Sequence, residues 1–422
     1  MAGADAAIGK DRKITALEGL RGIAAMQVFL LHYVTAFLPS TQMPVASLTS
    51  WAHFLVRSPL TILIDGYSAV YIFFVLSGAV LTLAFTNTTI PWPANLLRRT
   101  IRLGLPMAGA SVFGFVLLYL WPHSHIEAAT LSHSENWLGA LYTGPTILRH
   151  LFREILCNGL FLGYNGTTLF NQWPSAERFL RLQSITNSFN PPLWTLHYEL
   201  YGSGIVLLLC TLRRKNRWLY LSALLASIPV LGGNPLMLFV IGHLLTPVAA
   251  RGLVGKRQAQ IGAVASFGLL VLGEMICIQR DWHIVHDLDR WLGHIAILQP
   301  QVEPLFHSAV GGTLVAIGVF LNPWLRRGLS LRPVAYLGRL SFSIYLVHFP
   351  LLVTVVSWTY IRIIGPLGPS LGFFTTLGLG LALSLVMATL FERLVDRPAV
   401  LLSRRAGAAF RPVPADCAVS LS

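Results

Sequence analysis

Long apolar stretches alternate with short polar connections along most of the chain. A helix needs roughly 20 mostly apolar residues to cross the hydrocarbon core of a bilayer. Stretches that reach or approach this length predict an all-α fold, a polytopic membrane bundle of about ten transmembrane helices at Leu17–Leu38, Ser68–Thr86, Gly104–Trp121, Pro192–Leu212, Trp218–Leu231, Pro235–Ala250, Ile261–Ile278, Ser308–Leu321, Phe342–Tyr360 and Phe373–Glu392. We expect one transmembrane domain over residues 17–398, between cytoplasmic tails at residues 1–16 and 399–422.

The composition agrees with a membrane protein. Apolar residues make up 54% of the 422 residues, charged residues only 11%, and the mean hydropathy is +0.64. A soluble chain usually carries about a quarter charged residues. The net charge of +14 would point to nucleic acid in a soluble protein. Here the basic residues fall in short clusters between apolar stretches, as in cytoplasmic loops, so we expect a lipid bilayer and no nucleic acid as partner.

The basic clusters also predict the orientation of the chain. With ten spans every cluster falls on one side of the membrane, which places both termini in the cytoplasm. The clusters are Lys10, Arg12 and Lys13; Arg98, Arg99 and Arg102; Arg213, Arg214, Lys215 and Arg217; Arg251, Lys256 and Arg257; Arg326, Arg327, Arg332 and Arg339; and Arg393, Arg397, Arg404 and Arg405. The opposite side holds the connections Pro122–Asn190 and Gln279–His307, an interfacial helix around Ile147–Leu162, and a glycosylation sequon at Asn165.

Ionisable residues inside apolar spans are costly, and the first span has three of them. His32 follows Arg21 by eleven positions, close to three helical turns and roughly 16 Å along the axis, so both lie on one stripe. Glu18 lies one turn before Arg21 and can pair with it. Arg21 is either a snorkelling anchor or part of a site. His32 is either a packing residue or a general base, since burial keeps it in the neutral form that a base needs.

Motifs along the chain resemble acyltransferase family 3, whose members are multi-pass membrane proteins that transfer acyl groups to hydroxyls. The family pattern of a basic residue, ten intervening residues and a histidine is similar to Arg21 through His32. Further matches in family order are Leu17-Glu18-Gly19-Leu20-Arg21-Gly22, Phe73-Phe74-Val75-Leu76-Ser77-Gly78, the arginine-rich Arg98–Pro106, Pro192-Leu193-Trp194-Thr195-Leu196-His197-Tyr198-Glu199, Gly338–His348, and Glu392-Arg393 with Arg397-Pro398. The chain departs modestly, with Glu18 where Asp is usual and an added His197.

The resemblance implies transfer of an acyl group, usually acetyl, from acyl-coenzyme A as co-substrate, with no tightly bound cofactor. His32 would be the general base on the acceptor hydroxyl. Arg98, Arg99 and Arg102, with Arg21, would bind the donor's phosphates, or else only set the topology. Glu199 would orient a histidine or the acceptor, although a structural ion pair is the preferred interpretation. Trp194, Tyr345 and His348 either line the same cavity or pack helices.

Other chemistries are weaker on the sequence. A transporter or exporter would also use intramembrane Arg, His and Glu, but it favours symmetry between halves, which the chain lacks. A non-catalytic scaffold leaves the motif spacing unexplained. Ser370 lies in a GxSxG match at a turn, without the strand that a nucleophile elbow requires. The outer histidines resemble chance spacing more than a metal site, and we expect no metal at His123, His125, His283 and His286.

The acceptor is constrained only loosely. The outer connections lack an appended domain, which suits a small hydroxylated molecule or a carbohydrate better than a bulky polymer. The sequence resembles fungal members of the family, some of which modify secondary metabolites. We therefore expect a multi-pass membrane O-acetyltransferase of a small hydroxylated acceptor, without assigning its organelle.

Overall fold

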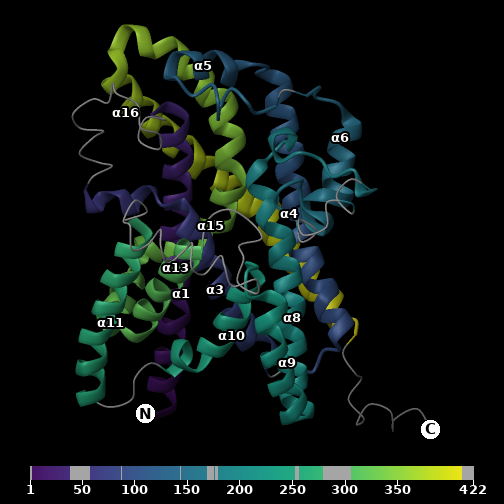
Figure 1. Cartoon of the computed structure of the whole chain (residues 1–422), viewed down its shortest axis with the longest axis vertical. Helices are drawn as coiled ribbons and strands as arrows, with labels where there is room; N and C mark the ends of the chain where they lie inside the picture. Colours follow the sequence, from purple (N-terminus) through teal and green to yellow (C-terminus); the bar gives the residue numbers. More distant parts are fainter. Residues whose placement is uncertain are drawn as a thin grey trace.

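The chain forms a tall bundle of helices in a computed structural model that describes residues 2–38, 58–86, 88–142, 144–168, 175, 179–251, 256–278 and 306–410 (Figure 1). Within these residues the only β pairing is an isolated bridge between Asn165 and Ser184. The α-helices are α1 (Ala2–Phe37), α3 (Gly66–Phe85), α4 (Trp92–Leu120), α5 (Ser124–Ser132), α6 (Leu148–Arg153), α8 (Leu196–Lys215), α9 (Arg217–Leu231), α10 (Leu236–Arg251), α11 (Lys256–Ile278), α13 (Phe306–Leu321), α14 (Pro323–Leu329), α15 (Arg332–Leu351), α16 (Ser357–Phe391) and α17 (Arg397–Ala408).

Shorter helical turns join or extend these helices. Three are 3₁₀ turns: η2 (Pro59–Ile64), η4 (Ile185–Asn187) and η5 (Pro191–Thr195). The other three are π-helical: η3 (Glu154–Leu162), η7 (Leu352–Val356) and η8 (Glu392–Asp396). A π-helical turn widens the helix and is frequent at functional sites. Two of the three lie directly after α15 and α16.

Short polar side chains begin several of the apolar helices. The Asn216 side chain accepts hydrogen bonds from the backbone of Trp218 and Leu219, and so caps α9. Asn322 caps α14 in the same way, and the chain bends by 94° between α13 and α14. Asp65 caps α3 through the backbone N–H of Ser68 at 3.1 Å. Each cap satisfies backbone donors that the first turn of a helix leaves free.

All ten apolar segments predicted from the sequence lie in helices. Among the residues that the structure describes, five helical stretches are long and apolar enough to cross a membrane, and the bent pair α13–α14 adds a sixth. One of them, Arg332–Ala408, has 77 residues and would extend roughly 115 Å if straight, far more than one crossing requires. Gly368, with φ 71° and ψ 171°, breaks it, and α16 turns back along α15 (Figure 1). Ser370 lies just after this break in helix, with no strand before it.

Glycines bring α1 and α15 into backbone contact. A Cβ at Gly338 of α15 would lie 2.1 Å from the carbonyl oxygen of Glu18, and one at Gly22 would lie 2.5 Å from the backbone nitrogen of Gly338. A second close approach joins α3 to α10, where a Cβ at Gly78 would lie 2.3 Å from the Phe239 carbonyl oxygen. Small residues are what allow helices to pack this closely in membranes.

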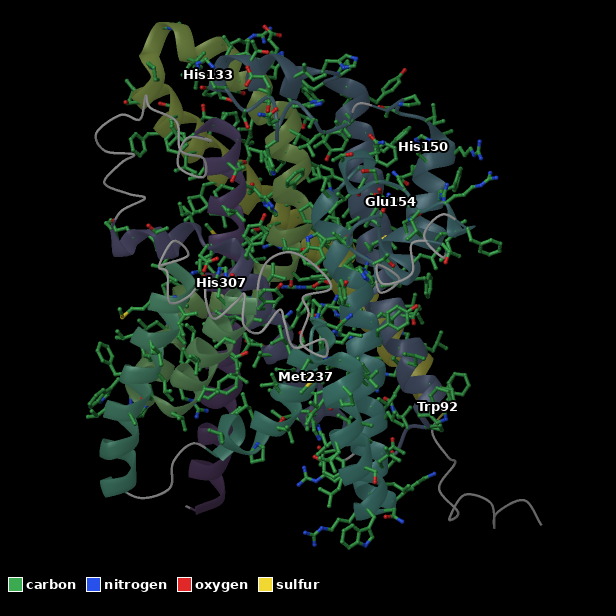
Figure 2. All side chains as sticks on the ribbon, in the orientation of Figure 1. Trp92, His133, His150, Glu154, Met237 and His307 are labelled. Carbon is green, nitrogen blue, oxygen red and sulfur yellow. The ribbon has the colours of Figure 1, made fainter. Side chains whose placement is uncertain are left out.

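The two ends of the bundle differ. The start of α1 and the end of α17 lie at the same end, which we call the terminal end (Figure 1). Trp92, at the start of α4, lies near it, whereas His133 lies at the opposite, outer end (Figure 2). The outer end is covered by α5, α6 and the turn of α16 (Figure 1). We call α5, α6, η3 and the chain between them the outer cover. The helix predicted around Ile147–Leu162 is present as α6 continued by η3, and its place at the membrane interface stays a prediction.

Candidate functional site

Three motifs that are distant in sequence meet in one polar network near the middle of the bundle. Glu199 of α8 accepts a 2.7 Å hydrogen bond from the Ser77 hydroxyl of α3 at Oε1. Its Oε2 accepts a 2.7 Å hydrogen bond from an Arg99 guanidinium nitrogen of α4, which forms an ion pair. Arg99 Nε also donates to the Ser203 hydroxyl at 2.7 Å. The side chains of Arg99 and Glu199 are only 20% and 13% exposed, so each charge depends on the other.

Beside this network lies an inner cavity of about 180 Å³. One wall is charged, because α1 and α4 supply arginines and α8 supplies a glutamate. The other wall is aromatic, because α3 and α15 supply phenylalanine and tyrosine rings. The lining residues are Arg21, Val70, Phe73, Phe74, Arg99, Arg102, Leu103, Thr195, Leu196, Glu199, Ser341, Phe342 and Tyr345. Three guanidinium groups face one carboxylate, so the cavity carries an excess of positive charge and is suited to an anion.

The three arginines of the inner cavity differ in their partners. Arg99 is paired with Glu199, and Arg102 forms a bidentate ion pair with Asp396 of η8. Arg21 forms no ion pair with the part of the chain that the structure describes, and its buried Nε has no hydrogen-bond partner there. Its guanidinium carbon lies 6.0 Å from the centroid of the Phe73 ring. Of these three arginines, Arg21 is therefore the one with donors left for a ligand among the residues that the structure describes.

A second cavity of about 470 Å³ shares four lining residues with the first: Arg21, Arg102, Ser341 and Phe342. It lies at the end of α15 where Arg339 is exposed, and it is completed by η8 and α17. Its remaining lining residues are Glu18, Gly338, Arg339, Glu392, Asp396, Arg397, Val400, Leu401 and Arg404. Arg397 pairs with Glu392 at 2.7 Å. We call this cavity the mouth, because exposed arginines line it at the terminal end.

Two histidines pair beyond the opposite end of the inner cavity. His32 Nδ1 of α1 lies 2.9 Å from His348 Nε2 of α15, and the two rings are nearly parallel (20° between planes) with centroids 5.1 Å apart, as a hydrogen bond in the plane of the rings requires. The Trp137 ring, from the outer cover, stacks on His32 at 6.0 Å, and the Phe349 ring meets it edge-on at 4.9 Å. Neither histidine lines either cavity.

Tyr345 lies between the inner cavity and the histidine pair. Its ring lines the cavity, and its centroid lies 6.2 Å from that of His348 one turn later. The Tyr345 hydroxyl donates to the Pro192 carbonyl oxygen and lies 2.8 Å from the Thr195 hydroxyl, both in η5. Tyr345 is therefore held by η5 at the place where the cavity ends.

The outer cover contains a buried carboxyl group away from both cavities. Glu154 begins η3, is fully buried, and accepts a 2.9 Å hydrogen bond from the backbone N–H of Phe189 (Figure 2). Burial raises the pKa of Glu154 to about 7, although the hydrogen bond from the Phe189 N–H opposes the shift. Burial likewise lowers the pKa of His125, whose Nε2 donates to the Leu141 carbonyl oxygen at 2.8 Å.

The structure brings together most, but not all, of the residues selected from the sequence. Arg21, Arg99, Arg102, Glu199 and Tyr345 line the inner cavity, and Glu18 lines the mouth. His32 and His348 pair with each other. The remaining candidates lie elsewhere. Trp194 packs edge-on against Tyr198, and Arg98 donates to Asn95 and packs against Gly407. His197 packs against Gly163, and Asn165 is exposed.

The outer histidines give no metal-binding cluster in the part of the chain that is described. No group of three or more His, Cys, Asp or Glu side chains there could hold a metal ion. His125 is buried and bonded to a backbone carbonyl, and His123 has a left-handed backbone with φ 61°. His283 and His286 lie outside the described residues.

Several residues of the site were not selected from the sequence. Ser77 stands inside a quoted motif, and its bond to Glu199 could have been anticipated from the polar hydroxyl in an apolar span. Asp396 follows the Glu392-Arg393 pair, and an acidic residue at the end of an apolar helix needs a cationic partner. Arg339 of α15 and Arg404 of α17 resemble topology charges, and only the packing of α17 onto α4 brings Arg404 to the mouth.

Comparison with known proteins gives the family of the chain. A family model described as an acyltransferase domain, Acyl_transf_3, matches residues 14–389. The chain is 24% identical over 450 residues to Acyltransferase R4 of Phoma sp. (strain ATCC 20986 / MF5453), covering 91% of this chain and 93% of that protein. It is 23% identical over 455 residues to Acyltransferase clz18 of Cochliobolus lunatus, covering 93% and 95%. No solved structure gives a significant match.

Proposed function

Because this chain belongs to acyltransferase family 3 and is a multi-pass membrane acyltransferase, we propose that it transfers an acetyl group from acetyl-coenzyme A to a hydroxyl of a small molecule. The observation that carries this proposal is the basic inner cavity, which runs from an arginine-lined mouth toward a histidine pair. Its volume of about 180 Å³ is below the roughly 300–1,000 Å³ of drug-sized ligand sites and suits a short acyl group.

The donor enters from the mouth in this proposal. The mouth is lined by five arginines and three carboxylates, an excess of positive charge that suits a polyphosphate: Arg21, Arg102, Arg339, Arg397 and Arg404 against Glu18, Glu392 and Asp396. Of the arginines predicted for this role, Arg102 faces both cavities, Arg99 is committed to Glu199, and Arg98 lines neither. Arg21, with unused donors, would bind an anionic or carbonyl group at the junction.

The chemistry is direct transfer between donor and acceptor. His32 accepts the proton of the acceptor hydroxyl, and the oxygen attacks the thioester carbonyl carbon. A C–O bond forms and the C–S bond breaks, and the leaving thiolate takes the proton back from His32. The thioester reaches His32 past Tyr345, and the acceptor reaches it from the outer end, where Trp137 and Phe349 flank the ring. Glu199 serves as the structural partner of Arg99.

The membrane arrangement belongs to the same proposal. Ten crossings with both tails in the cytoplasm place the mouth toward cytoplasmic acyl-coenzyme A, and they place Asn165 on the opposite side. Exposure of Asn165 and the position of the described chain ends at one end of the bundle support this orientation. We further propose that the acceptor is a secondary metabolite, consistent with the two fungal relatives of the chain.

Acetyl transfer tests the proposal directly. Purified protein in detergent is incubated with labelled acetyl-coenzyme A and a panel of hydroxylated acceptors, and coenzyme A release is measured. We expect release that requires both an acceptor and His32, and that falls by about 10²–10⁴-fold in His32→Ala. His150→Ala, a histidine of α6 on the outer cover, is the matched control and retains activity. Folded protein that neither binds nor consumes acyl-coenzyme A would contradict the donor assignment.

A further inference from the structure

We infer that His348 is a positioning residue that fixes His32 in the tautomer with a proton on Nδ1 and a free lone pair on Nε2. The inference rests on the proposed function for its catalytic consequence. The tautomer itself follows from two hydrogen bonds and can be measured without any substrate.

The first hydrogen bond defines the protonation of His348. Its Nδ1 lies 2.9 Å from the carbonyl oxygen of Ile344, one turn earlier in α15. A carbonyl oxygen only accepts, so His348 Nδ1 carries the proton and donates it. His348 is fully buried, and a buried imidazolium without a carboxylate partner is unfavourable. A neutral imidazole has a single N–H, so His348 Nε2 is left as an acceptor.

The second hydrogen bond transfers this constraint to His32. His348 Nε2 lies 2.9 Å from His32 Nδ1, and an acceptor on one side requires a donor on the other. His32 Nδ1 therefore carries the proton of the neutral ring, and the lone pair of His32 is on Nε2. That nitrogen is the one able to take a proton from an acceptor hydroxyl. When it does, the imidazolium keeps its Nδ1–H bond to His348, which stabilises the charge.

The local structure of α15 holds His348 in this role. Pro350 has no backbone N–H, so it leaves the carbonyl oxygen of Leu346 without its usual partner in the helix. The Asn190 side chain, from the outer connection, donates to that carbonyl at 2.7 Å. The π-helical turn η7 begins two residues after Pro350. The turn of α15 that carries His348 is thus fastened by Asn190, and the ring of Trp137 stacks on His32.

Two substitutions of His348 distinguish the effect of losing its hydrogen-bond acceptor from the effect of changing its side-chain volume. His348→Leu removes the acceptor and keeps an apolar group of similar size. His348→Gln supplies an amide oxygen near the position of Nε2, which can accept from His32 Nδ1. We expect His348→Leu to lower kcat by about 10²-fold or more with a smaller change in the KM for the donor. His348→Gln restores kcat to within about tenfold of the wild type.

A matched control addresses the cost of losing any buried histidine. His243 of α10 is also buried and doubly bonded, to the Thr82 hydroxyl at 2.8 Å and the Tyr220 hydroxyl at 3.0 Å, but it lies outside both cavities and away from His32. His243→Leu removes two hydrogen bonds and should lower thermal stability. Its kcat stays near that of the wild type, which separates destabilisation from loss of the tautomer.

The deciding measurement is ¹⁵N nuclear magnetic resonance of histidine-labelled protein in lipid, with His32→Gln used to assign the signal. Protonated and unprotonated ring nitrogens have well-separated shifts, so the tautomer is read without substrate. We expect His32 with Nδ1–H in the wild type and in His348→Gln, and a loss of this preference in His348→Leu. Wild-type His32 with Nε2–H would overturn the inference, as would equal kcat losses in folded Leu and Gln variants. If acyl transfer fails altogether, the spectrum still decides the tautomer.

Discussion

Gly338→Ala places a methyl group in the tightest contact between α1 and α15. The added Cβ would lie 2.1 Å from the carbonyl oxygen of Glu18 and 2.4 Å from its carbon, where ordinary contact begins at 3.4 Å. The helices must therefore separate by about 1.3 Å, and the obstacle is backbone, which cannot rotate away. Overpacking of this kind costs about 1–3 kcal/mol. The better helix propensity of alanine offsets up to about 1 kcal/mol of that.

The same separation reaches the histidine pair. His348 lies ten residues after Gly338, roughly 15 Å along α15. If α15 tilts away from α1 so that the gap at the pair opens by about 1 Å, the 2.9 Å distance between His32 and His348 exceeds hydrogen-bonding range. We therefore expect Gly338→Ala to lower the melting temperature by a few degrees and to lower kcat by at least tenfold.

The assay compares thermal unfolding in detergent with acetyl transfer for Gly338→Ala and a control. Gly378 of α16 has open space where its Cβ would be, so Gly378→Ala tests the substitution without the clash. We expect the control to unfold at the wild-type temperature or slightly above it. A Gly338→Ala protein that unfolds at the same temperature as the control would refute the close approach of α1 and α15.

Three further predictions concern charges. Glu199→Gln leaves the Arg99 guanidinium unpaired and should lower the free energy of unfolding by about 3 kcal/mol. The Arg99→Gln/Glu199→Gln double variant should regain part of that loss, and thermal unfolding of the two variants checks this. An additive loss in the double variant would argue against the ion pair. Because the pKa of Glu154 is about 7 in the folded protein against an ordinary value of 4.5, the folded state binds more protons between these values, so stability falls by about 3 kcal/mol as pH rises through that window. Glu154→Gln should flatten the dependence of the melting temperature on pH. Arg404→Gln, at the mouth, should raise the KM for acetyl-coenzyme A severalfold and leave kcat unchanged. Inhibition by dephospho-coenzyme A, used as a competitor of the donor, checks that a phosphate is involved.

The positions of the helices could be predicted from the sequence because a membrane span has a simple signature. Apolar length and flanking basic residues depend on local composition alone, and every predicted segment is helical in the structure. The meeting of Arg99 with Glu199 was also accessible in principle, because a buried charge in an apolar span requires a partner. Their motifs lie about 100 residues apart, and the spacing of charges does not say which pairs form.

Residues whose roles depend on the path of the chain could not be assigned from the sequence. Arg98, Arg99 and Arg102 look alike in sequence, but the helix turns them in different directions, so only two of them face the inner cavity. The mouth requires α17 to pack against α4, a contact between distant segments. The histidine pair requires α1 and α15 to touch along their length, and the glycines that permit this have no periodic signature of their own.

The placement of Arg21 and His32 on one stripe of α1 then explains why α15 must be its neighbour. Arg21 lines the inner cavity, whereas His32 lies beyond Tyr345 and lines neither cavity. His32 is linked to the cavity through α15, because it bonds to His348, one turn after Tyr345. Tyr345 and His348 occupy the matching stripe of α15, one turn apart, so that α15 supplies both a ring that lines the inner cavity and the group that orients His32. The backbone contact at Gly22 and Gly338 fixes the register between the two stripes. A shift by one turn, roughly 5.4 Å, would put Tyr345 near the place of His348 and leave His32 without its acceptor.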